Sequence, residues 1–134
     1  MRKYHYPALF LSETDGFSIS FPDLPGCHTQ GNDLEEAFEM AEDALTLYLY
    51  QLEEMGDRLP TASVIKETPE NSVVYVISAD TMAYREQFDN TAVKKTLTIP
   101  SWMNKAAEKQ GVNFSKLLQT ALKDQLIGHG DRHV

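Results

Sequence analysis

The sequence predicts an α+β protein in two parts: an amino-terminal antiparallel sheet with one long helix, and a small carboxyl-terminal strand–helix–helix unit. Strand-like segments and turn residues occupy residues 4–31, and apolar residues recur at helical spacing over residues 34–52. The charge balance then reverses. Residues 1–90 hold 5 Lys/Arg and 17 Asp/Glu, and residues 91–134 hold 7 and 3, giving formal charges of −12 and +4. This asymmetry favours phosphate as the partner of the basic part and a basic protein as the partner of the acidic part. The alternative is that the acidic faces only aid solubility.

Bulk properties fit a globular protein of the cytoplasm. The chain has 134 residues, 42% of them apolar, and its single cysteine, Cys27, excludes an internal disulfide framework. No apolar run approaches the roughly 18 residues of a membrane span, so no membrane partner is expected. The first 15 residues carry a basic pair and a short apolar run, but acids follow and no small-residue cleavage site appears. This segment predicts a first strand and not a signal peptide.

The first two strands are expected to pair as an antiparallel hairpin. Residues 4–11 form an apolar and aromatic run. A turn follows, in which Gly16 is free to take positive φ. Beyond it, Phe17, Ile19 and Phe21 alternate with serines, so they share one face of the second strand.

A long amphipathic helix is predicted next. Prolines and a glycine over residues 22–26 interrupt the sheet, and residues 27–31 can form a brief third strand. Asp33 is a good N-cap, Glu36 can complete a capping box, and Gly56 suits the C-cap. The apolar positions recur at helical spacing: Leu34, Ala37, Phe38, Ala41, Ala44, Leu45, Tyr48, Leu49 and Leu52.

The remainder of the acidic part is less regular. Residues 72–77 are a short β-branched run, which predicts a buried strand of the same sheet. Residues 80–90 are polar and form either a linker or a short helix capped by Asp80 or Thr81. The domains expected are 1–90 and 91–127, followed by a disordered polar tail at 128–134.

The carboxyl-terminal unit begins with an alternating strand that Pro100 ends. One face carries Lys94, Thr96 and Thr98, and the other carries Lys95, Leu97 and Ile99. A first helix follows, with apolar positions at Trp102, Met103, Ala106 and Ala107. Gly111 interrupts it, and Asn113 caps a second helix whose apolar face holds Phe114, Leu117, Leu118, Ala121, Leu122 and Leu126.

These three elements are too short to bury their own apolar faces, so the unit should fold only by pairing with a second copy. Pairing creates a two-stranded ribbon of a size that fits the DNA major groove. The expected dimer core consists of Leu97, Ile99, Trp102, Leu117, Leu118 and Ala121.

Residues 93–126 resemble the ribbon-helix-helix family of DNA-binding proteins. The resemblance rests on the strand that ends in Ile99-Pro100, on Gly111 and on the Asn113-Phe114-Ser115 start of the second helix. It implies that Lys94, Thr96 and Thr98 contact base edges, and that backbone N–H groups of residues 113–115 bind phosphate. Two of the three residues expected to contact base edges are short threonines. One dimer should therefore distinguish DNA sequences only modestly, and several dimers are expected to act together on the operator. The alternative is that the threonines serve only β-propensity.

The acidic part resembles HicB, the antitoxin of HicAB toxin–antitoxin pairs. The matching segments are the Tyr6-Pro7-Ala8 strand, the hairpin through residues 16–19, residues 21–27, and Thr29 to Ala37 with its continuation through Ala44-Leu45. The resemblance implies a truncated ribonuclease H-like fold without catalytic machinery. It also implies a domain that blocks HicA, a small basic ribonuclease with a double-stranded-RNA-binding-like fold.

Together the two resemblances predict an antitoxin that neutralises a HicA-like, mRNA-cleaving toxin and represses its own operon. Operator DNA is the second partner, and the protein is expected to be a homodimer, with a dimer of dimers as a higher assembly. Acids on the amino-terminal part are the candidates for toxin contact: Asp23, Asp33, Glu35, Glu39 and Glu42.

Two other functions are weighed. An enzyme would need a nucleophile and a base, but Cys27 and His28 are adjacent in a strand and point to opposite faces. A ligand-sensing repressor would need a site, and His5, Cys27 and His28 match no tight metal-binding spacing. His129 and His133 lie in the polar tail. No catalytic residue, cofactor or metal is therefore expected.

Overall fold

The computed structural model describes residues 3–128. The chain divides into two compact units, residues 1–90 (unit 1) and residues 91–134 (unit 2). The division coincides with the point where the charge balance reverses. Each unit is described by itself below.

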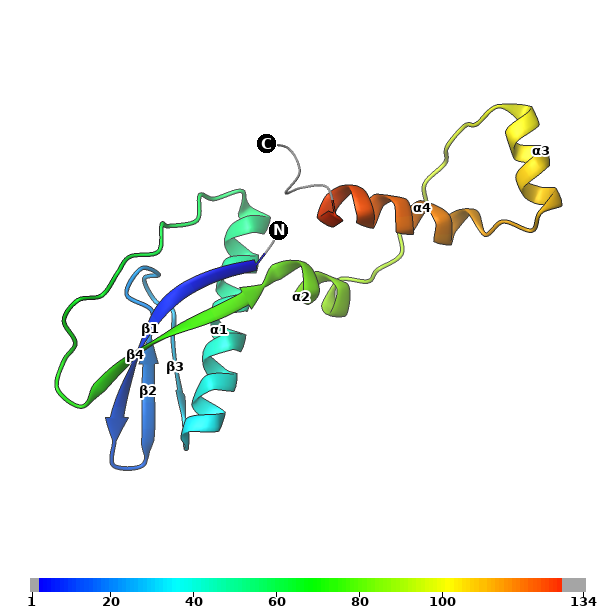
Figure 1. Ribbon diagram of the computed structural model, residues 1–134. Coiled ribbons are helices and arrows are strands. Elements are labelled where there is room, and N and C mark those ends of the chain that lie inside the picture. Colours follow the sequence, from blue (N-terminus) through cyan, green and yellow to red (C-terminus); the bar gives the residue numbers. More distant parts are fainter. Residues whose placement is uncertain (1–2, 129–134) are drawn as a thin grey trace. The chain divides into compact units, whose positions relative to one another are not determined.

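Unit 1 is a four-stranded antiparallel sheet with the strand order β3-β2-β1-β4 (Figure 1). The strands are β1 (Lys3–Glu13), β2 (Gly16–Ser20), β3 (His28–Gly31) and β4 (Ser72–Asp80). The predicted hairpin is confirmed, because β1 pairs with β2 in a register that places Phe10 opposite Ile19. The brief third strand is also present, and it pairs with β2.

One long helix, α1 (Leu34–Met55), packs on one face of this sheet. Its buried side chains are Ala37, Ala41, Leu45 and Leu49, which follow the predicted helical spacing. From the sheet, Phe10 and Ile19 are each 1% exposed. Burying a side chain of this size contributes about 1.5–3 kcal/mol, so the interface between α1 and the sheet is the stabilising centre of unit 1.

Both ends of α1 are capped. The Asp33 carboxylate accepts a hydrogen bond from the Glu36 N–H at 2.8 Å, as the N-cap prediction requires. Glu36 reaches back to the N–H of Asn32 at 3.0 Å, one residue earlier than a capping box would place it. At the other end Gly56 has φ 73°, and its N–H bonds to the carbonyl of Glu53 at 3.1 Å.

Strand β4 corrects a prediction. The β-branched composition of residues 72–77 predicts a buried strand, but β4 lies at the edge of the sheet and runs on to Asp80. Ile77 and Ala79 are buried, whereas Val73 and Val76 are 52% and 66% exposed. Ile77 and Ala79 alternate with the exposed Val76 and Ser78, as in a strand with one face in water, whereas Val73 is exposed near the start of the strand on the same face as Ile77. β-branched residues suit any pleated strand, so composition alone does not distinguish the centre of a sheet from its edge.

Helix α2 (Thr81–Phe88) follows β4 directly. Of the alternatives for residues 80–90, the structure has a helix capped by Asp80, whose carboxylate accepts a hydrogen bond from the Ala83 N–H at 2.9 Å. The helix ends at the boundary of unit 1.

Unit 2 contains two short helices, α3 (Ser101–Lys109) and α4 (Phe114–Lys123), followed by a π-helical turn, η1 (Asp124–Gly128). Gly111, between the helices, has φ 70°, and the Asn113 side chain caps α4 by accepting from the Lys116 N–H at 3.0 Å. The helix limits predicted from sequence are therefore close to those observed. Of the tail predicted over 128–134, only Gly128 is described, as the end of η1; His129 and His133 lie outside the described residues.

The predicted strand over residues 94–99 is absent from the single chain, in which residues 91–100 have no regular secondary structure. A strand needs a hydrogen-bonded neighbour, and the ribbon-helix-helix prediction takes that neighbour from a second copy. The ribbon itself therefore remains a prediction.

Candidate interaction surfaces

The outer face of α1 is acidic. Glu35, Glu39 and Glu42 are all exposed, and their spacing of four and three residues places them on one side of the helix. They lie in the first half of α1, where the helix dipole favours negative charge. These three predicted toxin contacts thus form one continuous, solvated surface.

The other two predicted contacts have structural roles. Asp33 caps α1, as described above. Asp23 is half-buried, and its carboxylate accepts a hydrogen bond from the Ser63 N–H at 3.0 Å, which holds the segment that connects α1 to β4. A partner that contacts either carboxylate would compete with a bond that the fold uses.

A hollow of about 370 Å³ lies between α1 and α2. Its rim carries three acids, and apolar side chains line its wall. Phe88 and Leu47 are 64% and 43% exposed there. The acidic residues are Glu42, Asp43 and Asp80. Sequence reasoning did not find this hollow because it depends on how α2 packs against α1.

Arg85 anchors α2 to the end of α1. Its guanidinium forms ion pairs with Glu53 at 2.8 Å and with Glu54 at 2.9 Å. The guanidinium carbon also lies 4.7 Å from the centroid of the Tyr50 ring, which is a cation–π contact. Tyr4 donates a further hydrogen bond to Glu53 at 2.6 Å. Burial raises the pKa of Glu53, but hydrogen bonds, including those from Tyr4, Arg85 and Thr81, outweigh burial and bring the pKa to about 2.

Replacement of Glu53 should give a pH-dependent loss of stability. Its carboxylate is more acidic in the folded protein than in the unfolded chain, so its contribution is complete above pH about 4.5 and is lost as pH falls toward about 2. Glu53→Gln should lower the free energy of unfolding at pH 7 by roughly 1–2 kcal/mol, because it removes charge-assisted hydrogen bonds that water partly screens. The difference from wild type should shrink between pH 4.5 and pH 2 in denaturant titrations. An equal deficit at pH 7 and pH 2.5 would contradict this assignment, and Glu54→Gln, at the more exposed partner, serves as the control.

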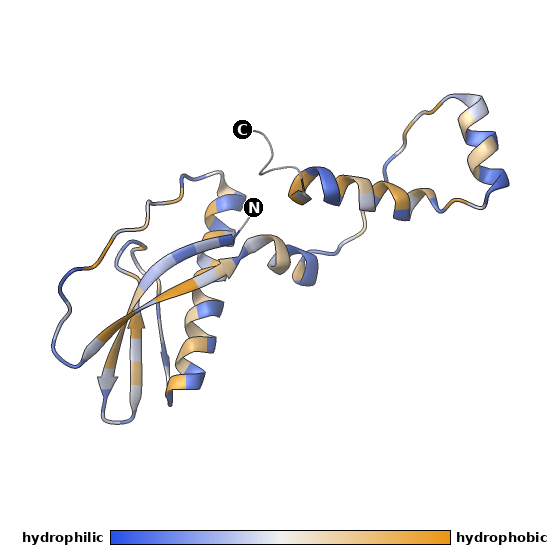
Figure 2. Cartoon of the chain, in the orientation of Figure 1, coloured by the Kyte–Doolittle hydropathy of each residue, from blue (hydrophilic) through white to orange (hydrophobic). Residues whose placement is uncertain are grey.

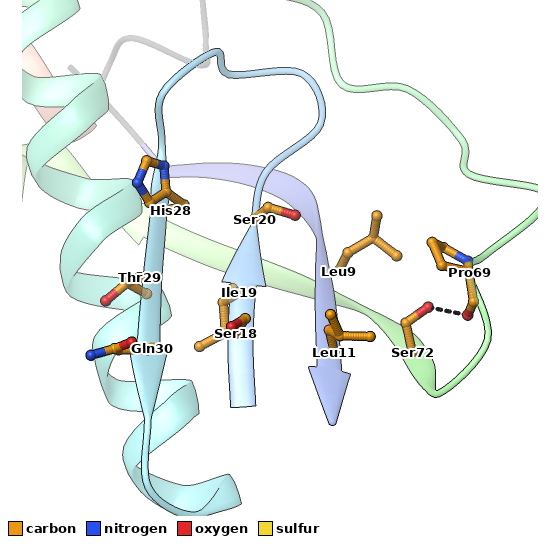
Figure 3. A pocket seen from close by; sticks show the side chains of 10 residues that line it. All are labelled: Leu9, Leu11, Ser18, Ile19, Ser20, His28, Thr29, Gln30, Pro69 and Ser72. Carbon is orange, nitrogen blue, oxygen red and sulfur yellow. Dashed lines mark hydrogen bonds between the residues drawn. The ribbon is translucent and has the colours of Figure 1, made fainter. Parts of the chain in front are cut away.

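The face of the sheet opposite α1 is open. A shallow hollow of about 360 Å³ lies there, shown in Figure 3, lined by Leu9, Leu11, Ser18, Ile19, Ser20, His28, Thr29, Gln30, Pro69 and Ser72. The lining holds hydroxyl groups, the Gln30 amide, aliphatic groups and the imidazole of His28, but no carboxylate or ammonium group.

The residues considered for metal or nucleophilic chemistry do not form a site. His5 Nδ1 lies 2.7 Å from Ser78 Oγ, whereas His28 is exposed on β3. Cys27 is buried, and burial raises the pKa of its thiol to about 11, so the reactive thiolate is scarce at neutral pH. Among residues 3–128, no group of three or more His, Cys, Asp or Glu is arranged to hold a metal ion.

Unit 2 has no core within one chain. None of residues 91–127 is buried, although its helices carry clear apolar faces (Figure 2). Trp102 is 68% exposed and Leu117 is 59% exposed. Of the predicted dimer-core residues, Leu97, Ile99 and Ala121 are also exposed, and Leu118 is half-buried. A single unit of this kind leaves its main apolar surface in water, which is unfavourable by about 25 cal/mol per Å².

The predicted DNA contacts lie on the surface of unit 2. Lys94, Thr96 and Thr98 are exposed in the irregular segment before α3. Phe114 and Ser115 form the first turn of α4, where backbone N–H groups are free to bind an anion. The predicted ribbon, which would join these groups into one DNA-binding face, requires two chains.

These features describe a small two-unit protein with an acidic α+β unit and a basic helical unit whose apolar surface is exposed. The chain belongs to the HicB-like antitoxin family of bacterial toxin–antitoxin systems, whose family model matches residues 6–122.

Curated relatives agree with this assignment. An antitoxin HicB 2 of Photorhabdus laumondii is 33% identical over 86 residues, which are 60% of this chain and 61% of the relative. An uncharacterised 14.9 kDa protein of Haemophilus phage HP1 is 32% identical over 62 residues, 46% of this chain and 47% of the relative. The chain thus spans between about half and two-thirds of the length of these relatives.

Solved structures share the fold. A chain in a toxin–antitoxin complex from Streptococcus pneumoniae matches with a TM-score of 0.57 and 28% identity, over 92% of this chain and 99% of that one. The crystal structure of an antitoxin HicB3 matches with a TM-score of 0.50 and 23% identity, over 92% and 98%, which supports the fold alone. Within residues 3–128, no helix is both long enough and apolar enough to span a membrane.

Proposed function

We propose that the protein is an antitoxin with two activities. Unit 1 binds and neutralises a HicA-like, mRNA-cleaving toxin, and residues 91–127 dimerise and bind operator DNA, so that the protein represses its own operon. The observation that carries the proposal is the contrast between the two units: unit 1 is acidic and has a buried apolar core, whereas unit 2 is basic and leaves its apolar face exposed.

The charge of unit 1 supports a basic partner. A ribonuclease that binds RNA presents a positive surface, and a unit with formal charge −12 matches it. The exposed acids of α1 adjoin the hollow between α1 and α2, where the apolar side chains of Leu47 and Phe88 are accessible. Acids around an accessible apolar patch resemble the polar rim and apolar centre of protein interfaces.

Charge reversal on α1 should weaken toxin binding. The variant that replaces Glu35, Glu39, Glu42 and Asp43 by lysine should bind the toxin at least about 100-fold less tightly at low salt, because like charges then face the basic surface. Salt should weaken the wild-type complex and have a smaller effect on the variant. Affinity is measured by calorimetry at two ionic strengths.

The matched control reverses four exposed acids away from α1: Asp15, Asp57, Glu67 and Glu70. It changes the net charge equally, so it should slow association modestly and leave the dissociation rate unchanged. If both variants lost the same affinity, overall charge would account for binding and the α1 surface would be abandoned.

The properties of unit 2 support operator binding. It has a formal charge of +4, and its apolar face is exposed, as expected of a surface that a second copy covers. Asn113 caps α4 by accepting from the Lys116 N–H, which leaves the N–H groups of Phe114 and Ser115 for a phosphate. The ribbon that would pair residues 94–99 of two chains puts Lys94, Thr96 and Thr98 on its outer face.

Lys94→Ala should reduce operator affinity about 10-fold or more per dimer and relax base preference at one position of each half-site. Toxin neutralisation should be unchanged. The control is Lys109→Ala at the end of α3, which removes the same charge from a position not predicted to read bases. The affinities of both variants for operator DNA and for scrambled DNA are measured by fluorescence anisotropy. If Lys109→Ala and Lys94→Ala had equal effects, Lys94 would act only as part of the general positive charge.

A further inference from the structure

Three aromatic rings join α1 to α2 beside the hollow between these helices. The centroids of the Tyr50 and Tyr84 rings lie 4.7 Å apart, and those of Tyr84 and Phe88 lie 4.8 Å apart. Tyr50, Tyr84 and Phe88 thus form an aromatic row. Its inner end, Tyr50, is half-buried, whereas its outer end, Phe88, is 64% exposed. Tyr84 and Phe88 line the hollow, so an aromatic surface is accessible to a partner there.

The inner end of the aromatic row holds a guanidinium. The Arg85 guanidinium carbon lies 4.7 Å from the centroid of the Tyr50 ring, and its nitrogens form ion pairs with Glu53 and Glu54. An aromatic face combined with two carboxylates is therefore a guanidinium site in this fold. It shows within the protein itself which chemistry such a combination of groups binds.

The outer end of the aromatic row has the same combination of groups. The hollow that Phe88 lines also contains the carboxylates of Glu42, Asp43 and Asp80. Glu42 and Asp43 are exposed, and within residues 3–128 no ion pair uses any of these three acids. The described lining includes no lysine or arginine. The negative charge of the hollow is therefore accessible to a cation of a partner.

We infer that the hollow between α1 and α2 binds the side chain of one arginine of the toxin. The guanidinium stacks on Phe88 and pairs with Glu42 and Asp43. Its aliphatic stem packs against Leu47, which lines the same hollow and is 43% exposed. This step rests on the proposed function, because it takes the partner of unit 1 to be that toxin. It adds a specific anchor, which fixes the orientation of the toxin on the acidic surface of α1.

The chemistry of the hollow favours arginine over lysine. A guanidinium is planar, so it stacks on an aromatic ring while its separate nitrogens reach different carboxylates, which a compact ammonium group does less well. Arg85 combines both contacts at the inner end of the aromatic row. The volume of the hollow, about 370 Å³, lies near the lower end of the range for ligand pockets, which suits a single side chain.

The hollow is held in shape by contacts within unit 1. Arg85 ties α2 to the end of α1, and the Asp80 carboxylate caps the first turn of α2 by accepting from the Ala83 N–H at 2.9 Å. A site whose walls are already fixed requires little ordering when a partner binds, and this favours affinity. Because Asp80 also serves the fold, the experiments below leave it unchanged.

A basic toxin fits the hollow better than a second copy of this chain. Two units of formal charge −12 repel each other, and every lysine or arginine within residues 91–128 is a lysine. A ribonuclease, by contrast, needs cations on the surface that receives RNA phosphates, and arginine suits this task. An arginine held by the hollow no longer binds phosphate. The contact that anchors the toxin therefore also contributes to its neutralisation.

Two substitutions of Phe88 in the full-length protein separate an aromatic contact from an ordinary apolar one. Phe88→Leu keeps an apolar side chain but removes the ring, so it should weaken toxin binding about 10-fold. Phe88→Trp supplies the ring that attracts cations best, and it should bind at least as tightly as wild type. Calorimetry with the HicA-like toxin measures the three affinities. Equal affinities of wild type and Phe88→Leu would overturn the inference.

Removal of charge tests the acidic side of the hollow. Glu42→Gln combined with Asp43→Asn should weaken toxin binding about 30-fold or more, because a desolvated guanidinium then loses its carboxylates. The matched control is Glu35→Gln combined with Glu39→Gln, which removes the same charge from α1 outside the hollow. It should cost only about two- to five-fold. If both double variants lost the same affinity, the acids of α1 would act only as general charge and the inference would fail.

Substitutions in the toxin identify the arginine. Each surface arginine of the toxin is replaced by lysine, which keeps the charge but removes the planar group. One replacement should weaken binding to the wild-type antitoxin about 10-fold and have little further effect on binding to Phe88→Leu, because both changes remove the same contact. If no arginine of the toxin is coupled to Phe88 in this way, the hollow does not bind an arginine.

Failure of this inference can be distinguished from failure of the proposed function. If the wild-type protein does not bind the toxin, both are overturned. If charge reversal on α1 weakens toxin binding but Phe88→Leu does not, the proposed function stands and the inference is wrong. If Phe88→Leu lowers the mass of the protein in sedimentation and leaves toxin affinity unchanged, a second copy occupies the hollow, and the inference is again overturned.

Discussion

Leu118→Asp should abolish pairing through unit 2 and, with it, operator binding. Leu118 lies on the apolar face of α4 beside Leu117 and Ala121, in the group predicted to form the shared core. Burying an unpaired carboxylate at such an interface costs several kcal/mol, which corresponds to a loss of association of more than about 100-fold. A monomeric unit cannot form a two-stranded ribbon, so operator affinity should fall to the non-specific level.

The mass is measured by sedimentation of the full-length protein. Gln119→Asp is the matched control, because it adds the same charge one residue further along α4 at an exposed polar position. It should leave dimerisation intact and weaken DNA binding only slightly. Toxin affinity should be unchanged in both variants. A Leu118→Asp protein that still dimerises and binds operator would show that α4 does not contribute to the dimer core.

The elements of unit 1 were largely predictable because each has a strong local signal. Alternation of Phe17 and Ile19 predicts a strand with one buried face, and both the Asp33 cap and the Gly56 cap are where the sequence places them. Hydrophobic spacing and cap chemistry act over a few residues, so they can be recognised without knowledge of the fold.

Features that depend on packing between distant segments were not predictable. The edge position of β4 follows from the strand order, and the ion pairs of Arg85 join residues more than 30 positions apart. The α1–α2 hollow arises in the same way. One signal was available: Arg85 is one of only five cations among residues 1–90, which makes an ion pair with one of the many acids expected.

Unit 2 shows a different limit. Its helices and their caps agree with the sequence prediction, but the strand over residues 94–99 and the core do not appear in one chain. Trp102 and Leu117 are exposed in one chain, as expected of a unit that needs a second copy to form its core. Pairing is a property of two chains, so the ribbon and its base-reading face stay predictions until dimerisation is measured.

Gly31→Ala should unfold unit 1 at moderate temperature and release the toxin. Gly31 ends β3 beside the start of α1, and a Cβ atom there would lie 2.5 Å from the Ala37 nitrogen and 2.6 Å from its Cα. The Ala37 N–H is itself bonded to the Asp33 carbonyl at 2.9 Å, and its side chain is fully buried. The backbone that would have to move is therefore fixed by the cap and by the core. Overpacking of this kind costs about 3 kcal/mol or more, equivalent to a fall in Tm of roughly 15 °C for a unit of this size.

Gly26→Ala separates this steric effect from the ordinary cost of replacing a glycine. Gly26 has φ 81°, and no heavy atom lies within 4 Å of an added Cβ, so only backbone strain of about 1 kcal/mol is expected. Thermal unfolding followed by circular dichroism should rank wild type, Gly26→Ala and Gly31→Ala in decreasing order of Tm. Above the lowered Tm, Gly31→Ala should fail to neutralise the toxin but should still bind operator DNA, because unit 2 has no part in this contact. If Gly31→Ala were as stable as Gly26→Ala, β3 and α1 would have to be further apart than the structure places them.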